Sequence, residues 1–373
     1  MSFTALRQID WVLLSATLVL CAFGLVTMNS FIEPNTFFEQ QLVWLCVSLA
    51  VFFAAGLVDW RFLRNTSVVV TLLLVSVASL ALLFFLGTVT MGAVSRFNFG
   101  AFFLQPSDPA KLILVIVLAK YFSRRHVEIA HIRHILVSGF YALIFFLLLF
   151  IQPDFGGAIV AFFLWFGMVL VSGISKKHLA LVFMIGALAF GGLWSFVFQG
   201  YQKARILTFL NPLTDIQGAG YNAYQSTITV GSGEFLGKGV GFGTQSRLQF
   251  LPEYETDFIF GAFAEEWGFV GVILLLLCFG IVVWRIIREG FLGATNFETL
   301  FAVGVALTFV APAIIHIGMN VGLLPVTGTV LPFVSYGGSH LVIEFLSLGI
   351  LSGMRCYRRA AHRDVFGDEI VMQ

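Results

Sequence analysis

The chain has 373 residues, of which 59% are hydrophobic and 11% are charged, and its formal net charge is +1. Together with a mean hydropathy of +0.95, this composition excludes an ordinary soluble globular protein and is typical of a chain that crosses a membrane repeatedly. The balanced charge gives no indication of a nucleic-acid partner, and we expect none.

Ten apolar stretches follow one another along the chain, each close to the length that crosses the hydrocarbon core as a helix. The fourth is short, which indicates a helix that is tilted or is extended by Ser123 and Arg124 at the interface. The sequence therefore predicts an all-α polytopic membrane protein with about ten transmembrane helices, forming one membrane domain over residues 1–373. The stretches cover residues 11–30, 37–58, 66–87, 109–122, 133–152, 156–174, 178–198, 258–284, 297–320 and 337–355.

Basic residues concentrate in every second gap between these stretches. That set of gaps, together with the two ends of the chain, holds 15 of the 21 Lys and Arg residues. By the positive-inside rule, these gaps and both termini are cytoplasmic. Lys111 lies inside a predicted span, and the outward-facing gaps hold Arg96, Lys203, Arg205, Lys238 and Arg247. These five cations either balance nearby acids or hold an anionic ligand, and a phosphate would suit Arg205 and Arg96.

The one long loop covers residues from about 199 to 257, before the eighth stretch, and the predicted orientation places it outside the cell. Aromatic and aliphatic residues recur throughout it, which argues against disorder. Loops of this length are usually functional when they are ordered. Within it, residues 221–230 are expected to form a short interfacial helix, and the glycine-rich residues 231–243 form backbone that can approach a ligand closely.

Residues 105–111 (QPSDPAK) combine a helix start with two charges at the outer end of the fourth stretch. Asp108 is expected to cap this helix, with Pro109 at its first position. Lys111 then lies in the first turn, where the helix dipole disfavours a cation, so we expect it to pair with Asp108. The spacing leaves two interpretations equally open, a structural ion pair or a cation held at the outer mouth of a cavity.

A second polar group precedes and enters the eighth stretch. Thr256 is expected to cap this helix, which would put Asp257 in its first turn at the outer surface. Asp257 either complements the helix dipole or serves catalysis or ligand binding. Glu265 and Glu266 are costly to bury, so at least one of them is expected to pair with a basic or amide side chain in a structural role.

A third polar group lies in the last two stretches. His316 and Asn320 share a helix face, where a hydrogen bond in the core is favoured over metal ligation. The Pro- and Gly-rich residues 325–340 predict irregular backbone at membrane depth, which is tolerated only when it is buried in protein or lines a cavity. Asp154, at another outer helix junction, is expected to act as a cap.

Several of these motifs, in this order, resemble those of the SEDS family (shape, elongation, division and sporulation), and within it the RodA branch. The resemblance covers nearly the whole chain, which it identifies as a single SEDS-type membrane domain. Phe97, Asp108 and Glu255 depart from the family pattern, which usually has Trp, Glu and His at these positions. The matching motifs are residues 105–111, 152–154, 231–233, 243–246, 251–253, 256–260, 265–268, 320–322 and 332–339.

The resemblance implies a peptidoglycan glycosyltransferase of the bacterial cytoplasmic (inner) membrane, a multi-pass enzyme for cell elongation and shape. It would polymerise lipid II into glycan strands at the outer face of that membrane. Its implied partners are lipid II, the growing glycan strand, membrane lipids and a class B penicillin-binding protein, the transpeptidase that crosslinks the product. Two alternatives remain open, a lipid II flippase or transporter without glycosyl transfer, and a scaffold that only holds the transpeptidase.

Glycosyl transfer to a sugar hydroxyl needs a carboxylate base. The diphosphate leaving group is a stable anion, so it needs cations more than the second carboxylic acid of a glycoside hydrolase. The resemblance implies that Asp257 is the base of an inverting single displacement. A divalent cation would assist charge neutralisation, but no ligand cluster in the sequence predicts a metal site. The candidate substrate-binding residues are Lys111, Asp108, Arg205, Arg96, Asp154 and Gln225.

Overall fold

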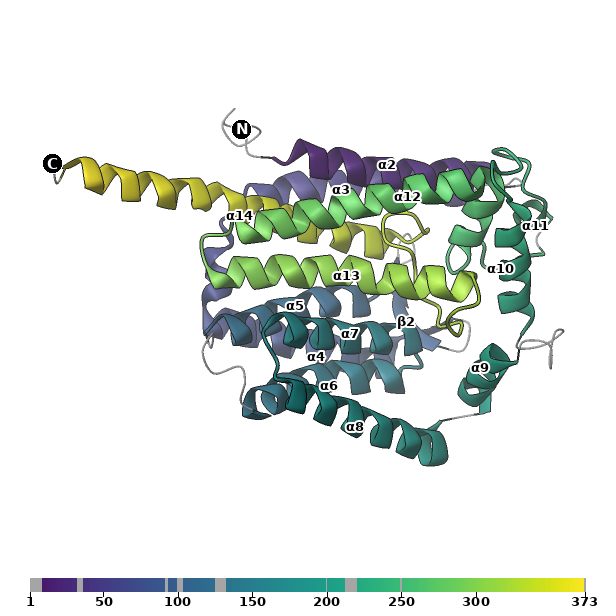
Figure 1. Cartoon of the computed structure of the whole chain (residues 1–373), viewed down its shortest axis with the longest axis horizontal. Helices are drawn as coiled ribbons and strands as arrows, with labels where there is room; N and C mark the ends of the chain where they lie inside the picture. Colours follow the sequence, from purple (N-terminus) through teal and green to yellow (C-terminus); the bar gives the residue numbers. More distant parts are fainter. Residues whose placement is uncertain are drawn as a thin grey trace.

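The computed structural model describes residues 9–31, 36–90, 93–98, 103–124, 132–198, 200–211, 220–248 and 250–371. Its long helices lie side by side in one bundle, with the C-terminal helix projecting from one end (Figure 1). Each of the ten predicted stretches coincides with one of these helices. They are α2 (Trp11–Asn29), α3 (Thr36–Gly56), α4 (Thr66–Leu86), α5 (Ser107–Ser123), α6 (Ile132–Ile151), α7 (Phe155–Val171), α8 (Lys176–Gly192), α12 (Ile259–Phe291), α13 (Asn296–Asn320) and α14 (Gly338–Val371).

The all-α polytopic class is confirmed. Among the described residues, seven helical segments are long and apolar enough to cross a membrane, and α7 is a shorter apolar helix. The seven are α2, α3, α4, α6, α12, α13 and α8 with its π-helical extension η2 (Leu193–Val197). At 1.5 Å per residue, α5 is only about 26 Å long, less than the usual core thickness. The count of ten spans stays a prediction.

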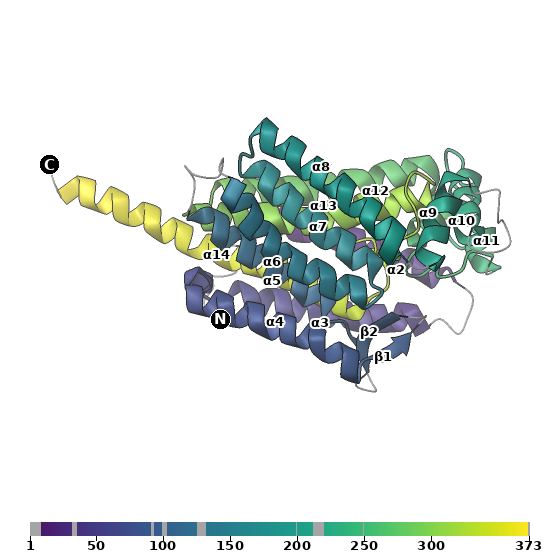
Figure 2. The same ribbon diagram turned by 90° about the horizontal axis from the view of Figure 1, so that it is seen from below.

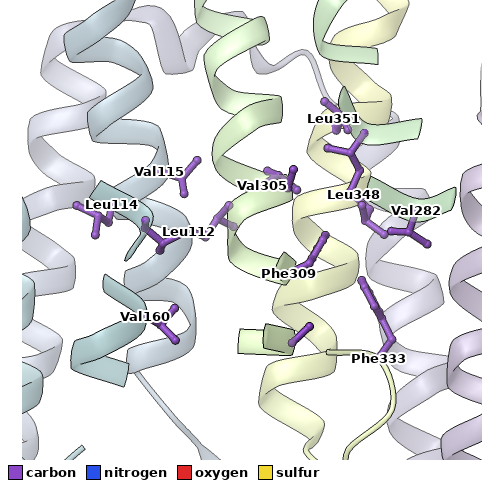
Figure 3. Packing of buried hydrophobic residues seen from close by; sticks show 14 of the residues in the cluster. Leu112, Leu114, Val115, Val160, Val282, Val305, Phe309, Phe333, Leu348 and Leu351 are labelled. Atoms are coloured by element: carbon purple, nitrogen blue, oxygen red, sulfur yellow. The ribbon is translucent and has the colours of Figure 1, made fainter. Parts of the chain in front are cut away.

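The core of the bundle is built around α13. Two thirds of its apolar window (67%) is buried, because α5, α7, α12 and α14 all pack against it. Val305 and Phe309 of α13 lie between Val115 of α5 and Leu348 of α14 (Figure 3). By contrast, no residue of α8 is buried, and this helix lies at the edge of the bundle (Figure 2). Helix α13 and the helices that pack against it therefore form the interior of the bundle.

A short antiparallel sheet joins α4 to α5, which the sequence did not predict. Its strands are β1 (Thr88–Thr90), β2 (Ala93–Asn98) and β3 (Phe103–Leu104), in the order β1-β2-β3. Thr88 pairs with Arg96, and Phe97 pairs with Leu104. Strands of two to six residues carry too little alternation to stand out from an apolar background. Figures 1 and 2 place β2 at the end of the bundle opposite the C-terminus.

The predicted long loop holds three further helices at that same end, α9 (Gly200–Leu210), α10 (Tyr221–Ser232) and α11 (Thr244–Arg247) (Figure 1). The helix predicted over 221–230 is confirmed as α10, and α9 and α11 were not predicted. By the positive-inside argument this is the extracytoplasmic end of the protein.

Helix α12 is interrupted at Gly268, whose φ of 63° and ψ of −168° are not helical. Gly268 lies about 26 Å along the helix from Arg285, which is within the thickness of a bilayer core. Backbone of the preceding loop fills the interruption. The N–H groups of Lys238 and Gly239 donate to the carbonyls of residues 265 and 266 at 2.9 and 3.0 Å. In return, the N–H groups of residues 269 and 270 donate to the carbonyls of residues 234 and 235 at 3.0 and 3.2 Å.

We expect Gly268→Ala to destabilise the protein, because only glycine adopts this backbone conformation readily and an added methyl group would overlap the backbone nitrogen of Gly237. The expected cost is about 1–3 kcal/mol, measured as a lower midpoint of thermal unfolding in detergent. Gly280→Ala, in the same helix with no other atom within 4 Å of its added methyl group, is the control and should leave the midpoint unchanged. Equal unfolding midpoints for Gly268→Ala and Gly280→Ala would show that the backbone at Gly268 does not require glycine.

Candidate functional site

Asp257 lies in a series of turns immediately before α12, and not in the first turn of the helix as predicted. Phe258 occupies the N-cap position without a side-chain hydrogen bond. The hydroxyl of Thr256 does not cap the helix and instead donates to the carboxylate of Glu253 at 3.1 Å. The helix starts later than its local sequence indicates because distant residues bind the backbone of this segment.

The backbone on both sides of the Asp257 side chain is held by three hydrogen bonds. The consecutive carbonyl oxygens of residues 255–257 accept, in turn, from the N–H of Tyr336 at 2.9 Å, the hydroxyl of Ser335 at 2.9 Å and the side-chain amide of Asn320 at 3.1 Å. Because these donors come from α13 and from the irregular segment before α14, two distant parts of the chain hold the backbone that carries the Asp257 side chain. Such support restricts a catalytic group to one geometry.

The half-buried Asp257 carboxylate faces Gly328. A methyl group added at Gly328, where φ is +75°, would lie 3.5 Å from Asp257 Oδ2. The segment that contains Gly328 also contacts the start of α7, since a methyl group added at Gly156 would lie 2.9 Å from the carbonyl oxygen of Thr327. Asp154, the N-cap of α7, accepts from the N–H of Gly157 at 2.8 Å. The predicted cap is confirmed, and the segment around Gly328 contacts both Asp257 and the first turn of the helix that Asp154 caps.

Lys111 and Asp108 form the predicted ion pair, with 3.2 Å between Nζ and Oδ1. The predicted helix cap is wrong, because α5 begins at Ser107 and its N-cap, Pro106, makes no side-chain hydrogen bond. The Asp108 carboxylate is engaged elsewhere, since His340 Nδ1 lies 3.3 Å from the same Oδ1 atom. Asp154 also attracts Lys111 electrostatically. The structure thus brings Asp108, Lys111 and Asp154 into one charged group.

The other candidates lie farther along the outer loop or in the sheet. Gln225 of α10 donates its side-chain N–H to the side-chain oxygen of Gln245, and so belongs to a second polar group that includes Glu265. Arg205 is exposed on α9, at the extracytoplasmic end of the bundle (Figure 1). Arg96 is in β2, and its side chain lies outside the described part of the structure.

The hydrogen bonds predicted for His316 and Asn320 are confirmed. His316 Nδ1 is 2.7 Å from the carbonyl oxygen of Thr329, and the Asn320 amide donates to the carbonyl of His316 at 2.8 Å. The Asn320 side-chain oxygen accepts from the hydroxyl of Ser226 at 3.0 Å. Asn320 therefore connects α10 and the Asp257 segment to α13. Within the described residues, no group of three His, Cys, Asp or Glu side chains is arranged to hold a metal ion.

Glu265 is fully buried and pairs with Lys238, with 2.6 Å between the carboxylate and Nζ. This confirms the prediction that one of the two adjacent glutamates has a basic partner. Its carboxylate also accepts from the N–H groups of Thr244 and Gln245 at 2.9 and 3.1 Å. Glu265 thus connects the loop before α12 to the helix that follows it.

Burial raises the pKa of Glu255, in the turns before α12, and the nearby Glu253 carboxylate adds to this effect.

Lys238→Met is expected to lower the thermal unfolding midpoint in detergent, because it leaves the Glu265 carboxylate buried without its cation. Loss of one partner of a buried pair costs about 3–5 kcal/mol. The double variant Lys238→Met/Glu265→Gln removes both charges and should recover most of that loss. A double variant no more stable than Lys238→Met would show that the ion pair does not stabilise this region.

The sequence matches the model of a cell cycle protein family, named for FtsW, RodA and SpoVE, over residues 4–360. The chain belongs to this family. Stage V sporulation protein E of Bacillus subtilis is 34% identical over 364 residues, covering 94% of this chain and 98% of that protein. Peptidoglycan glycosyltransferase MrdB of Escherichia coli is 33% identical over 286 residues, covering 75% of each chain.

Two solved structures also support the membership of this chain in the FtsW/RodA/SpoVE family. One of these structures is a chain from a peptidoglycan synthase complex that coordinates polymerization and crosslinking. It is 29% identical with a TM-score of 0.81, covering 94% of this chain and 98% of that chain. The rod shape determining protein RodA of Thermus thermophilus is 28% identical with a TM-score of 0.71, covering 94% and 97%. The SEDS resemblance predicted from the motifs is confirmed.

Two residues of this FtsW/RodA/SpoVE protein were not predicted for the site. His340 and Glu344 of α14 extend the charged group around Lys111, with 2.8 Å between His340 Nε2 and Glu344 Oε1. Their spacing of four residues on a helix was the available signal, because it places a basic and an acidic side chain on one face. Their contact with Asp108, more than 200 residues earlier, has no local signature.

Proposed function

We propose that this protein is the glycosyltransferase that polymerises lipid II into glycan strands at the outer face of the bacterial cytoplasmic membrane, with Asp257 as its general base. It is a polytopic inner-membrane enzyme of peptidoglycan synthesis, and curated relatives carry the name peptidoglycan glycosyltransferase. The observation that carries the site assignment is the Asp257 carboxylate, half-buried beside Gly328 on backbone that three hydrogen bonds hold in place.

In the proposed reaction, the acceptor sugar hydroxyl attacks the anomeric carbon of the donor while its proton passes to the Asp257 carboxylate. The bond from the anomeric carbon to the polyprenyl diphosphate breaks in the same step, so the configuration at that carbon is inverted. A positioned base contributes about 10²–10⁴-fold to such a step. One carboxylate suffices, because the departing diphosphate is a stable anion that needs no proton from a second acid.

The negative charge of the departing diphosphate needs positive partners that are already in place. Lys111 is the first cation proposed for this role, and its ion pair with Asp108 orients it. Arg205, Arg96 and Gln225 are proposed to bind substrate farther out along the loop and the sheet. The location of Lys111 in a cluster with Asp108 and Asp154 supports its part in this proposal.

A class B penicillin-binding protein is the proposed partner that crosslinks the product. The related chain solved within a peptidoglycan synthase complex supports this part of the proposal, since that complex coordinates polymerization and crosslinking. The growing glycan strand and lipid II are the proposed substrates. The transport alternative is not favoured by curated relatives that are named as glycosyltransferases.

The decisive test is polymerisation of lipid II by the purified protein in detergent, with and without a class B penicillin-binding protein. Detergent micelles have no leaflets, so transport alone leaves lipid II unchanged while a polymerase produces glycan strands. We expect strands that a muramidase degrades. If no polymer forms even with an active partner present, the glycosyltransferase proposal is wrong.

A further inference from the structure

A chain of four charged side chains connects α5 to α14. Lys111 Nζ lies 3.2 Å and His340 Nδ1 lies 3.3 Å from the same oxygen of Asp108, and His340 Nε2 lies 2.8 Å from Glu344. All four are shielded, since Asp108 and Glu344 are 5% and 4% exposed at their side chains and the two bases are each 15% exposed. Asp154 and Glu344 also attract Lys111.

The position of His340 between two carboxylates favours its charged form. The ring nitrogens Nδ1 and Nε2 lie 3.3 and 2.8 Å from carboxylate oxygens of Asp108 and Glu344. The second contact is an ion-pair distance without the alignment of a hydrogen bond. Two carboxylates this close stabilise the protonated imidazole ring relative to the neutral ring.

We propose that His340 is a positioning residue for the reaction, a second cation that offsets the surrounding carboxylates so that Lys111 retains its charge for the diphosphate of the lipid-linked substrate. The inference rests on the glycosyltransferase function proposed above. Three carboxylates act on Lys111, those of Asp108, Asp154 and Glu344. Without the charge on His340, Lys111 would face these carboxylates as the one basic group placed among them in the described part of the chain, and its attraction for an anionic ligand would be weaker.

The same residue also connects the cation to the base. One oxygen of Glu344 contacts His340, and the other accepts a hydrogen bond from the N–H of Phe333 at 3.0 Å. Phe333 lies within the turn whose residues Ser335 and Tyr336 bind the backbone around Asp257. Through Asp108, His340 is therefore linked to Lys111, and through Glu344 it is linked to the turn that holds the backbone around Asp257.

The test compares His340→Gln, Glu344→Gln and the double variant with wild type. Glutamine keeps a hydrogen-bond donor for Asp108 but has no charge. We expect His340→Gln to lower kcat/KM for lipid II by about tenfold, mainly through a higher KM, because an attraction made in both ground and transition states is weakened. The double variant restores the total charge around Lys111 and should recover most of the loss. Thermal unfolding in detergent checks that each variant is folded.

A structural role for His340 predicts the opposite pattern, in which the double variant is as impaired as His340→Gln or worse. That result would overturn the proposal, and so would a normal KM for His340→Gln. Binding of undecaprenyl diphosphate in detergent provides a readout that does not need turnover, and His340→Gln should weaken it by about tenfold. If wild type does not polymerise lipid II, the proposed function fails, while equal diphosphate affinity for wild type and His340→Gln would overturn this inference alone.

Discussion

Asp257→Asn is expected to lower the rate of lipid II polymerisation by about 10³-fold while the protein stays folded. The amide has nearly the shape of the carboxylate but cannot take the proton of the acceptor hydroxyl. The hydrogen bonds that hold the backbone here are accepted by the carbonyls of residues 255–257, so the substitution leaves those bonds in place. Initial rates with fluorescent lipid II, analysed by gel electrophoresis of the glycan product, measure the effect.

The matched control is Glu255→Gln, the same chemical change two residues earlier in the same turns. It should retain most of the activity, because the contact that fixes this residue is made by its backbone carbonyl. Affinity for lipid II should be similar in both variants, so that the loss in Asp257→Asn lies in kcat. An Asp257→Asn protein that keeps more than about a tenth of the wild-type rate would exclude Asp257 as the base.

Lys111→Met is expected to reduce polymerisation by about 10²-fold, the usual effect of removing one preorganised group that stabilises charge in the transition state. It should also lower the unfolding midpoint, because it leaves Asp108 paired with His340 alone while Asp154 and Glu344 remain nearby. Rates of polymerisation and thermal unfolding in detergent are measured on the same preparations.

The double variant Lys111→Met/Asp108→Asn separates these two effects. Removing both charges of the pair should restore much of the stability, because no buried carboxylate is left without its cation at this position. Activity should stay low, because the cation proposed for the diphosphate is still missing. Recovery of activity together with stability would show that Lys111 serves the fold alone.

Local patterns in the sequence predicted the helices and several contacts correctly. The apolar stretches predict α2 to α8 and α12 to α14 because a span must satisfy its backbone within its own helix. The ion pair of Lys111 with Asp108 and the cap at Asp154 also depend on neighbours three residues away. Such contacts can be inferred from spacing alone.

The wrong cap predictions involve both distant and local partners. Asp108 does not cap α5, and His340, 232 residues later, contacts its carboxylate. Thr256 does not cap α12, because its hydroxyl donates to Glu253 three residues earlier, while Ser335, 79 residues later, binds its carbonyl group. The role of Asp257 was implied by the family resemblance, since its spacing alone favoured a partner for the helix dipole. The donors that hold its backbone have no pattern that links them to it.

The interruption of α12 has a consequence for biosynthesis. A chain is made from its N-terminus, so residues 234–239 reach the far side of the membrane before residues 259–291 leave the translocon. Until the two meet, the carbonyls of residues 265 and 266 and the amides of residues 269 and 270 lack these partners, which is costly within a membrane. This span and the segment before it must therefore mature together. A nascent chain that lacks residues 234–239 would present an incomplete helix to the membrane quality-control proteases.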